Sequence, residues 1–134
     1  QAAELSRNMY SNSNFESDLI NSYAWDTAII FLQEFDNREN KTETTKPYSM
    51  QNSINKSLAV QGTNKSGTQD KICNIFDMAS NTNEWSTETY SDTINPCVGH
   101  GGYYRNSGIY TSYRGYNSTS GSGGSLAFRP LLYL

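Results

Sequence analysis

The chain has 134 residues, of which 35% are hydrophobic and 17% charged, and its net charge is −3 at pH 7. This length corresponds to one domain, and the scattering of the ten Lys and Arg residues argues against a nucleic-acid-binding surface. No apolar run reaches the roughly 18 residues of a membrane helix, so no membrane insertion is expected. The chain starts without Met, and we expect it to be the C-terminal part of a longer protein, with any targeting segment upstream.

Two amphipathic helices are predicted near the start of the chain. Residues 2–10 and 22–35 carry apolar side chains at helical spacing. The side chains expected to face the core are Leu5 and Met9 in the first helix and Trp25, Ala28, Ile29 and Leu32 in the second. Ser22 is the candidate N-cap of the second helix, and Asp26 is expected in its first turn, where a carboxylate suits the helix dipole.

The remainder of the chain predicts loops and short strands. Residues 36–70 are polar and predict a long loop excursion. Within it, GTNKSGT at 62–68 predicts a turn and not a phosphate loop, because no Lys follows its second glycine and no apolar strand precedes it. Short strands are expected within 71–90, 96–104 and 126–134. Helices followed by short strands indicate an α+β domain with extensive ordered loops.

Four phrases carry a resemblance to a known family. In chain order they are YAWDTA at 23–28, IFDMASNTNEW at 75–85, GHGGYY at 99–104 and LAFRPLL at 126–132. Their order and spacing resemble the formylglycine-generating-enzyme-like (sulfatase-modifying-factor) branch of the C-type lectin fold, which carries phrases like "YDMAGNVWEW", "RGGSW" and "GFR". The resemblance implies one C-type-lectin-fold domain over 1–134, with two helices and short antiparallel strands. His100 departs from the family pattern, because an Arg is usual there.

The residues that match the family phrases favour structural roles. Asp77 and Asn81 flank a turn whose backbone they can hydrogen-bond. Gly101 and its neighbour Gly102 allow close approach of strands or unusual backbone angles. The remaining matches are Phe76, Met78, Glu84, Trp85, Phe128 and Arg129, among which Trp85 and Phe128 are expected to fill the core.

Catalysis is not expected from this set of residues. Oxidases of the family bind copper with a pair of cysteines in the C-terminal part of the domain, and residues 98–134 contain no cysteine. Cys73 and Cys97 lie earlier, in predicted strands, and we expect them to be buried thiols or a structural disulfide. Iron-binding relatives use three histidines, and His100 is the only one here. We expect His100 to be a surface or hydrogen-bonded residue and not the base of a Ser–His–acid triad. Carboxylates such as Glu84 and Glu88 are expected on the solvated surface. No catalytic residue, cofactor or metal site is predicted.

The segment 99–125 is the strongest functional signal. It holds eight of the ten glycines and five of the ten tyrosines, and it has no acidic residue. Tyr provides large, rigid contact area and Ser, Gly and Asn provide adaptable hydrogen bonds, the mixture found in antibody paratopes. At strand positions, one of the two rings at 103 and 104 is expected in the core. The predicted ligand-binding residues are Tyr103, Tyr104, Arg105, Asn106, Ser107, Tyr110, Tyr113, Arg114, Tyr116, Asn117 and Ser118.

The same resemblance extends to the variable proteins of diversity-generating retroelements. In those proteins the residues between the "RGG"-like phrase and the closing "FR" are rewritten by adenine-directed mutagenesis, which cannot install Lys, Glu, Gln, Met or Trp. These five residue types occupy 22 of the other 107 positions and none of the 27 positions from 99 to 125. A segment that is simply rich in Gly, Ser and Tyr would exclude them too.

These observations favour a non-catalytic ligand-recognition module with a diversified face, such as a phage tail receptor-binding protein or a bacterial surface-display protein. A virion or a cell surface is the expected location, and the expected partner is a protein or glycan on a cell surface. Arg105 and Arg114, without neighbouring acids, suit an acidic or carbohydrate-rich target. Calcium-dependent sugar binding is not expected. The alternatives are an undiversified interaction domain of the same family and a divergent oxidase.

Overall fold

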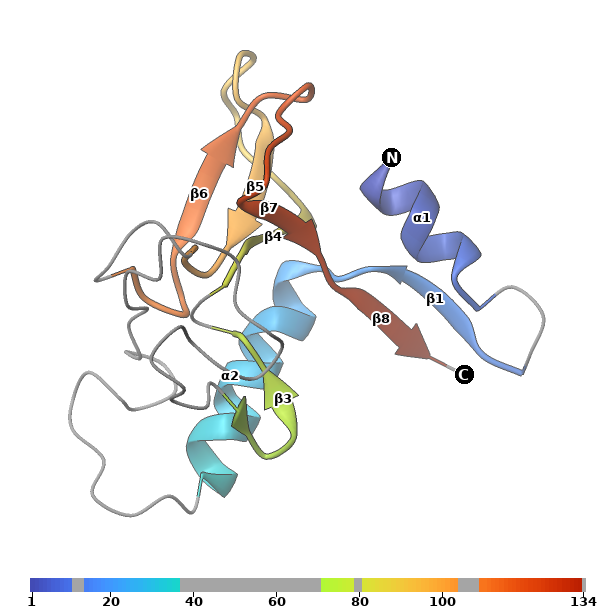
Figure 1. Cartoon of the computed structure of the whole chain (residues 1–134), viewed down its shortest axis with the longest axis vertical. Helices are drawn as coiled ribbons and strands as arrows, with labels where there is room; N and C mark the ends of the chain where they lie inside the picture. Colours follow the sequence, from blue (N-terminus) through green and yellow to red (C-terminus); the bar gives the residue numbers. More distant parts are fainter. Residues whose placement is uncertain (11–13, 37–70, 79–80, 104–108, 134) are drawn as a thin grey trace.

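The computed structural model describes residues 1–10, 14–36, 71–78, 81–103 and 109–133. The loop predicted over 36–70 therefore lies outside the described residues from position 37 on, as does the turn predicted at 62–68. In chain order the elements are α1 (Ala2–Asn8), β1 (Glu16–Leu19), α2 (Ser22–Phe35), β2 (Lys71–Ile72), β3 (Ile75–Phe76), β4 (Asn83–Thr89), β5 (Cys97–His100), β6 (Arg114–Asn117), β7 (Leu126–Phe128) and β8 (Pro130–Tyr133). Two helices with mixed sheets make this a small α+β fold (Figure 1).

Helix α2 supplies the core, as its sequence pattern predicts. Trp25, Ile29 and Leu32 are buried, and Ala28 is partly buried against them. Complete burial of side chains of this size contributes about 2–3 kcal/mol each. The full core cluster is Ile20, Trp25, Ile29, Leu32, Ile72 and Met78.

The start of α2 differs from the prediction by one residue. Asn21, and not Ser22, is the N-cap: its Oδ1 accepts a hydrogen bond from the Ala24 backbone N–H at 2.8 Å. Asn21 has the extended backbone that capping requires, whereas Ser22 already lies within the helix. Asp26 lies beyond the first turn, and its carboxylate pairs with Arg114 at 2.7 Å.

Helix α1 packs with a different side from the one predicted. Leu5 and Met9 are exposed, and Ser6 is the buried residue of the helix. The Ser17 hydroxyl donates to the Ser6 carbonyl oxygen at 2.6 Å, which ties α1 to β1. A small side chain at Ser6 allows α1 to lie close to the backbone of β1. The larger Leu5 side chain would not fit at this contact.

The main sheet has four strands in the order β6-β5-β4-β7. Strand β4 pairs antiparallel with β5 and parallel with β7, so the expectation of only antiparallel strands is wrong at this pair. Strands β6 and β7 both run in the direction of β4, and residues 118–125 must therefore return the chain across the sheet between them. Strands β1 and β6 were not among the predicted strands.

The first and last described strands form a separate antiparallel ribbon, β1–β8, which extends away from the main sheet (Figure 1). Ile20 joins the ribbon to the main sheet. Its backbone N–H donates to the Arg129 carbonyl oxygen, and its own carbonyl oxygen accepts from the Thr87 N–H, both at 3.0 Å. No helix among the described residues has the length and apolar character needed to cross a bilayer.

Candidate functional site

The closing phrase of the chain is anchored to an earlier phrase by Arg129. Its Nε and Nη2 donate to the two carboxylate oxygens of Glu84 at 2.7 and 2.8 Å, and Nη2 also donates to the Phe76 carbonyl oxygen at 2.8 Å. Glu84 is buried, so its expected place on the solvated surface is wrong. A carboxylate becomes stable inside because a bidentate guanidinium replaces its lost water.

A second contact joins the GHGGYY phrase to the same region. The Asn83 side-chain amide donates to the carbonyl oxygens of His100 and Gly101 at 2.9 and 2.8 Å. Gly101 has a φ of +72°, and a Cβ at this position would lie 2.7 Å from the Met78 carbonyl oxygen. The predicted need for glycine is therefore confirmed at Gly101. Asp77 and Asn81, which flank the predicted turn, both have positive φ, and the Asn81 amide donates to the Asp77 carboxylate at 3.2 Å; residues 79 and 80 lie outside the described residues.

Trp85 and Phe128 were predicted to fill the core, and this prediction is wrong. They pair in register across β4 and β7 and are only half-buried. Both lie on the face of the main sheet opposite the one that packs against α2, where they line a cavity.

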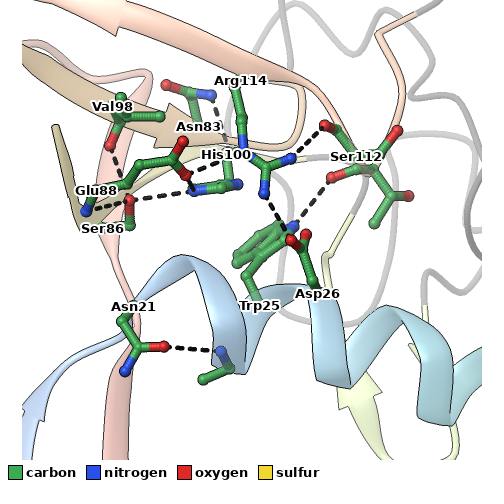
Figure 2. A network of polar contacts seen from close by, with 12 residues as sticks. Asn21, Trp25, Asp26, Asn83, Ser86, Glu88, Val98, His100, Ser112 and Arg114 are labelled. Carbon is green, nitrogen blue, oxygen red and sulfur yellow. Dashed lines mark hydrogen bonds and ion pairs between the residues drawn. The ribbon is translucent and has the colours of Figure 1, made fainter. Parts of the chain in front are cut away.

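On the face that packs against α2, a network of polar side chains surrounds His100 (Figure 2). The His100 side chain is completely buried; its Nε2 lies 3.1 Å from Ser86 Oγ and 3.3 Å from Glu88 Oε2. Arg114 donates to Glu88 at 3.0 Å and to Asp26 at 2.7 Å. The Trp25 ring packs on the imidazole with 5.0 Å between centroids.

Burial and the positive charge of Arg114 lower the pKa of His100 to about 4, which outweighs the opposite effect of the Glu88 and Asp26 carboxylates. The imidazole is therefore neutral at pH 7, with its proton on Nε2 toward the carboxylate of Glu88. Nδ1 is buried and has no hydrogen-bond partner among the described residues.

Ser86, His100 and Glu88 have the residue types of a hydrolase triad but not its connections. A relay needs the acid on one ring nitrogen and the nucleophile on the other. Here both the hydroxyl and the carboxylate face Nε2, and the Ser86 hydroxyl donates to the Val98 carbonyl oxygen at 3.3 Å inside the fold. The arrangement ties strands β4, β5 and β6 to α2.

Several predicted ligand-binding residues surround one hollow of about 300 Å³. Tyr103, Tyr113, Tyr116 and Asn117 all line it, although they come from separate parts of the segment. Tyr113 and Tyr116 expose about half of their surface, 46% and 50%. None of the described residues that line the hollow has a charged side chain.

The other predicted binding residues have different positions. Tyr110 is exposed at the surface and Ser118 is half-buried, and neither is among the residues that line the hollow. Arg114 forms ion pairs with Asp26 and Glu88 and points into the polar network on the face of the sheet that packs against α2 (Figure 2). Tyr104, Arg105, Asn106 and Ser107 lie outside the described residues.

The sequence-based prediction missed Tyr90, which lies outside 99–125. Its ring stacks on Tyr116 with 3.9 Å between centroids and an angle of 18° between planes. Both rings are about half exposed, so together they form an exposed aromatic pair. The prediction also missed Asn83, Ile109, Ser125 and Leu126 as lining residues. Only the pairing of strands reveals these neighbours, because no local sequence signal marks them.

The two cysteines are free thiols. Cys73 lies in the turn between β2 and β3 with a φ of +49°, and it is exposed, so the expectation of a buried strand position is wrong for it. Cys97 is half-buried at the start of β5. In the part of the chain that the structure describes, no three His, Cys, Asp or Glu side chains are grouped as metal ligands.

Comparisons with protein-family models, with curated proteins and with solved structures find no match for this chain.

Proposed function

We propose that this chain is a ligand-recognition module of the C-type-lectin type, and that its binding face is the Tyr-, Ser- and Gly-rich segment 99–125. We further propose that it serves as the variable protein of a diversity-generating retroelement, displayed on a phage tail or a bacterial surface. The expected target is a protein or a glycan on a cell surface.

The scaffold part of the proposal is supported by how the family-like phrases meet. Glu84 and Phe76 of one phrase hold Arg129 of the closing phrase, and Asn83 holds the backbone of the GHGGYY phrase at Gly101. These contacts give the residues of the separate phrases a shared structural role. They are compatible with a shared scaffold, because each phrase is needed to complete the environment of another.

The recognition part rests on one observation. Tyr103, Tyr113, Tyr116 and Asn117 line one hollow without charged side chains, and Tyr113 and Tyr116 keep about half of their surface exposed. A cluster of tyrosines that served only the core would be buried, as Trp25 is. Rigid aromatic rings around a concave surface bind partners at low entropic cost, which is the property that a recognition surface needs.

The proposal is tested by sequencing many natural copies of the locus from one population. Substitutions should concentrate at the lining positions 103, 113, 116 and 117, and the codons should be ones that adenine mutagenesis can reach. A reverse-transcriptase gene and a near-identical template repeat should lie nearby.

Arg114 provides an internal control within the segment. It lies between the variable positions in sequence, yet it pairs with Asp26 and Glu88, so it should stay constant. Variation spread evenly over the gene, or an invariant segment, would contradict diversification and leave a module for one fixed partner. Equal variation at 114 and 116 would contradict the assignment of the binding face.

A further inference from the structure

A second and larger cavity, of about 730 Å³, adjoins the tyrosine hollow at Leu126. It is bounded by α1, by the Trp85 end of β4, by β7 and by residues 119–123. Its size falls within the range of roughly 300–1,000 Å³ typical of small-molecule sites. The two concave regions share Leu126, but the larger one is lined by none of the predicted binding residues.

One wall of this cavity is aromatic. Trp85 and Phe128 lie side by side on the parallel strands β4 and β7, and Leu5 of α1 also lines the space. Gly121 allows the covering loop to approach the indole: a Cβ there would lie 3.4 Å from the Trp85 ring and 3.0 Å from the Ser118 carbonyl oxygen. Leu5 is exposed although it was predicted to face the core. A ligand bound against this wall would cover its side chain.

The rim of the cavity is polar. Thr119, Ser120 and Ser122 are all exposed and bring hydroxyl groups to its edge, where each can donate and accept hydrogen bonds. No described lining residue has a charged side chain, although the chain as a whole contains 10 Lys and Arg residues and 13 Asp and Glu residues.

We propose that this cavity binds an uncharged saccharide of about two sugar units. A sugar ring has a face of C–H groups that lies flat on an indole or phenyl ring, and hydroxyl groups at its edge that bond to Ser and Thr. An ionic ligand would lose its water without gaining a counter-charge. A purely aliphatic ligand would gain no hydrogen bond from the hydroxyl rim. A neutral saccharide can contact both the aromatic wall and the hydroxyl rim. Residues 119–123 of the cavity belong to the segment 99–125, but none of the described tyrosines of that segment lines it.

The two tryptophans make the test specific. Trp85 lines the cavity, whereas Trp25 is fully buried and its indole N–H donates to the Thr111 carbonyl oxygen at 3.1 Å. Indole N–H signals in a ¹H–¹⁵N NMR spectrum, assigned with a Trp85→Phe variant, are followed during titration with cellobiose, maltose and N,N′-diacetylchitobiose. We expect at least one of these sugars to shift the Trp85 signal saturably and to leave the Trp25 signal in place.

Two variants locate the site. Ala3→Phe fills the cavity from α1 and should weaken binding by about tenfold or more, while Asn8→Phe places the same ring on an exposed, non-lining position of α1 and should leave it unchanged. A double Ser120→Ala and Ser122→Ala variant, changed only at exposed positions, should also weaken binding.

Several results would overturn the proposal: no saturable shift with any of the three sugars at millimolar concentration, a shift of both indole signals, equal binding by Ala3→Phe and Asn8→Phe, or a saturable shift with hexanoate or hexanol in place of the sugars. Tyr113→Ala separates this site from the tyrosine face, because Tyr113 lines only the other hollow. Sugar binding that persists in Tyr113→Ala supports a second site, whereas sugar binding that is lost there assigns the sugar to the tyrosine face and overturns the cavity.

Discussion

At the scale of single residues, backbone conformation explains why certain positions have their residue types. Gly101 has a positive φ and a close backbone neighbour, so glycine is required there on two independent grounds. Asp77 and Asn81 also have positive φ, and Asn and Asp tolerate this region better than other side chains. The positive φ values are local properties of the backbone, whereas the close approach of Gly101 to Met78 depends on the tertiary fold.

Gly101→Ala is expected to reduce the free energy of unfolding by about 2 kcal/mol or more, because the new methyl group meets the Met78 carbonyl oxygen in a strained backbone conformation. Urea denaturation measures this. Gly123→Ala is the matched control: a Cβ at Gly123 meets nothing within 4 Å, so the change should stay within about 0.5 kcal/mol. Equal effects of the two substitutions would contradict the account of Gly101.

At the scale of elements, the fold depends on charged side chains that join strands distant in sequence. Arg129, between β7 and β8, reaches Glu84 on β4, and Arg114 on β6 reaches Glu88 on β4. Strand β4 thus provides carboxylates to both edges of the main sheet. Beside the pairing of β4 with β7, the Arg129–Glu84 ion pair joins β4 to the closing phrase.

Arg129→Met is expected to cost about 3 kcal/mol in the free energy of unfolding, because it leaves the buried Glu84 carboxylate without its counter-charge. The double variant with Glu84→Met should lose less than the sum of the two single changes. The comparison variant is Arg7→Met, which removes the exposed Arg7–Asp18 pair and should cost less than about 1 kcal/mol. Additive single effects at Arg129 and Glu84 would argue against the direct pair.

At the scale of the whole molecule, the buried network at His100 couples stability to pH. Groups face the imidazole from every element packed on it: Ser86 and Glu88 from β4, Arg114 from β6, and Trp25 and Asp26 from α2. Since the pKa of His100 is lowered to about 4 in the folded chain, the unfolded chain takes up the proton first as pH falls. Stability therefore falls as pH decreases from about 6.5 to about 4, and His100 contributes no further loss below that range.

Between pH 7 and pH 5, this proton uptake should cost about 2 kcal/mol of unfolding free energy. The His100→Gln variant removes the titrating group, so its unfolding free energy should change less over the same interval. Thermal or urea denaturation of both proteins at the two pH values measures the difference. The same pH dependence in the variant would assign the effect to carboxylates and contradict this role of His100.

The sequence predicted features that depend on nearby residues better than features that depend on contacts between distant residues. The helix at 22–35, its buried stripe and the α+β class were predicted, because each depends on side-chain spacing within a few residues. The outward position of Leu5 and the parallel pairing of β7 with β4 were not predicted. Both depend on which distant strand packs against the element concerned. Of the predicted binding residues, Tyr103, Tyr113 and Tyr116 line one hollow, and their role in binding stays a prediction.

The sequence by itself determined the core helix, the turn positions that need Gly, Asn or Asp, and the concentration of tyrosines in one segment, because local periodicity and backbone sterics operate between near neighbours. Only the tertiary structure decided the roles of Arg114, His100 and Trp85. Arg114 was predicted to bind a ligand. In the structure it pairs with Asp26, which is 88 residues away in sequence. Likewise, the pairing of β4 with β7 placed Trp85 beside a cavity and not in the core.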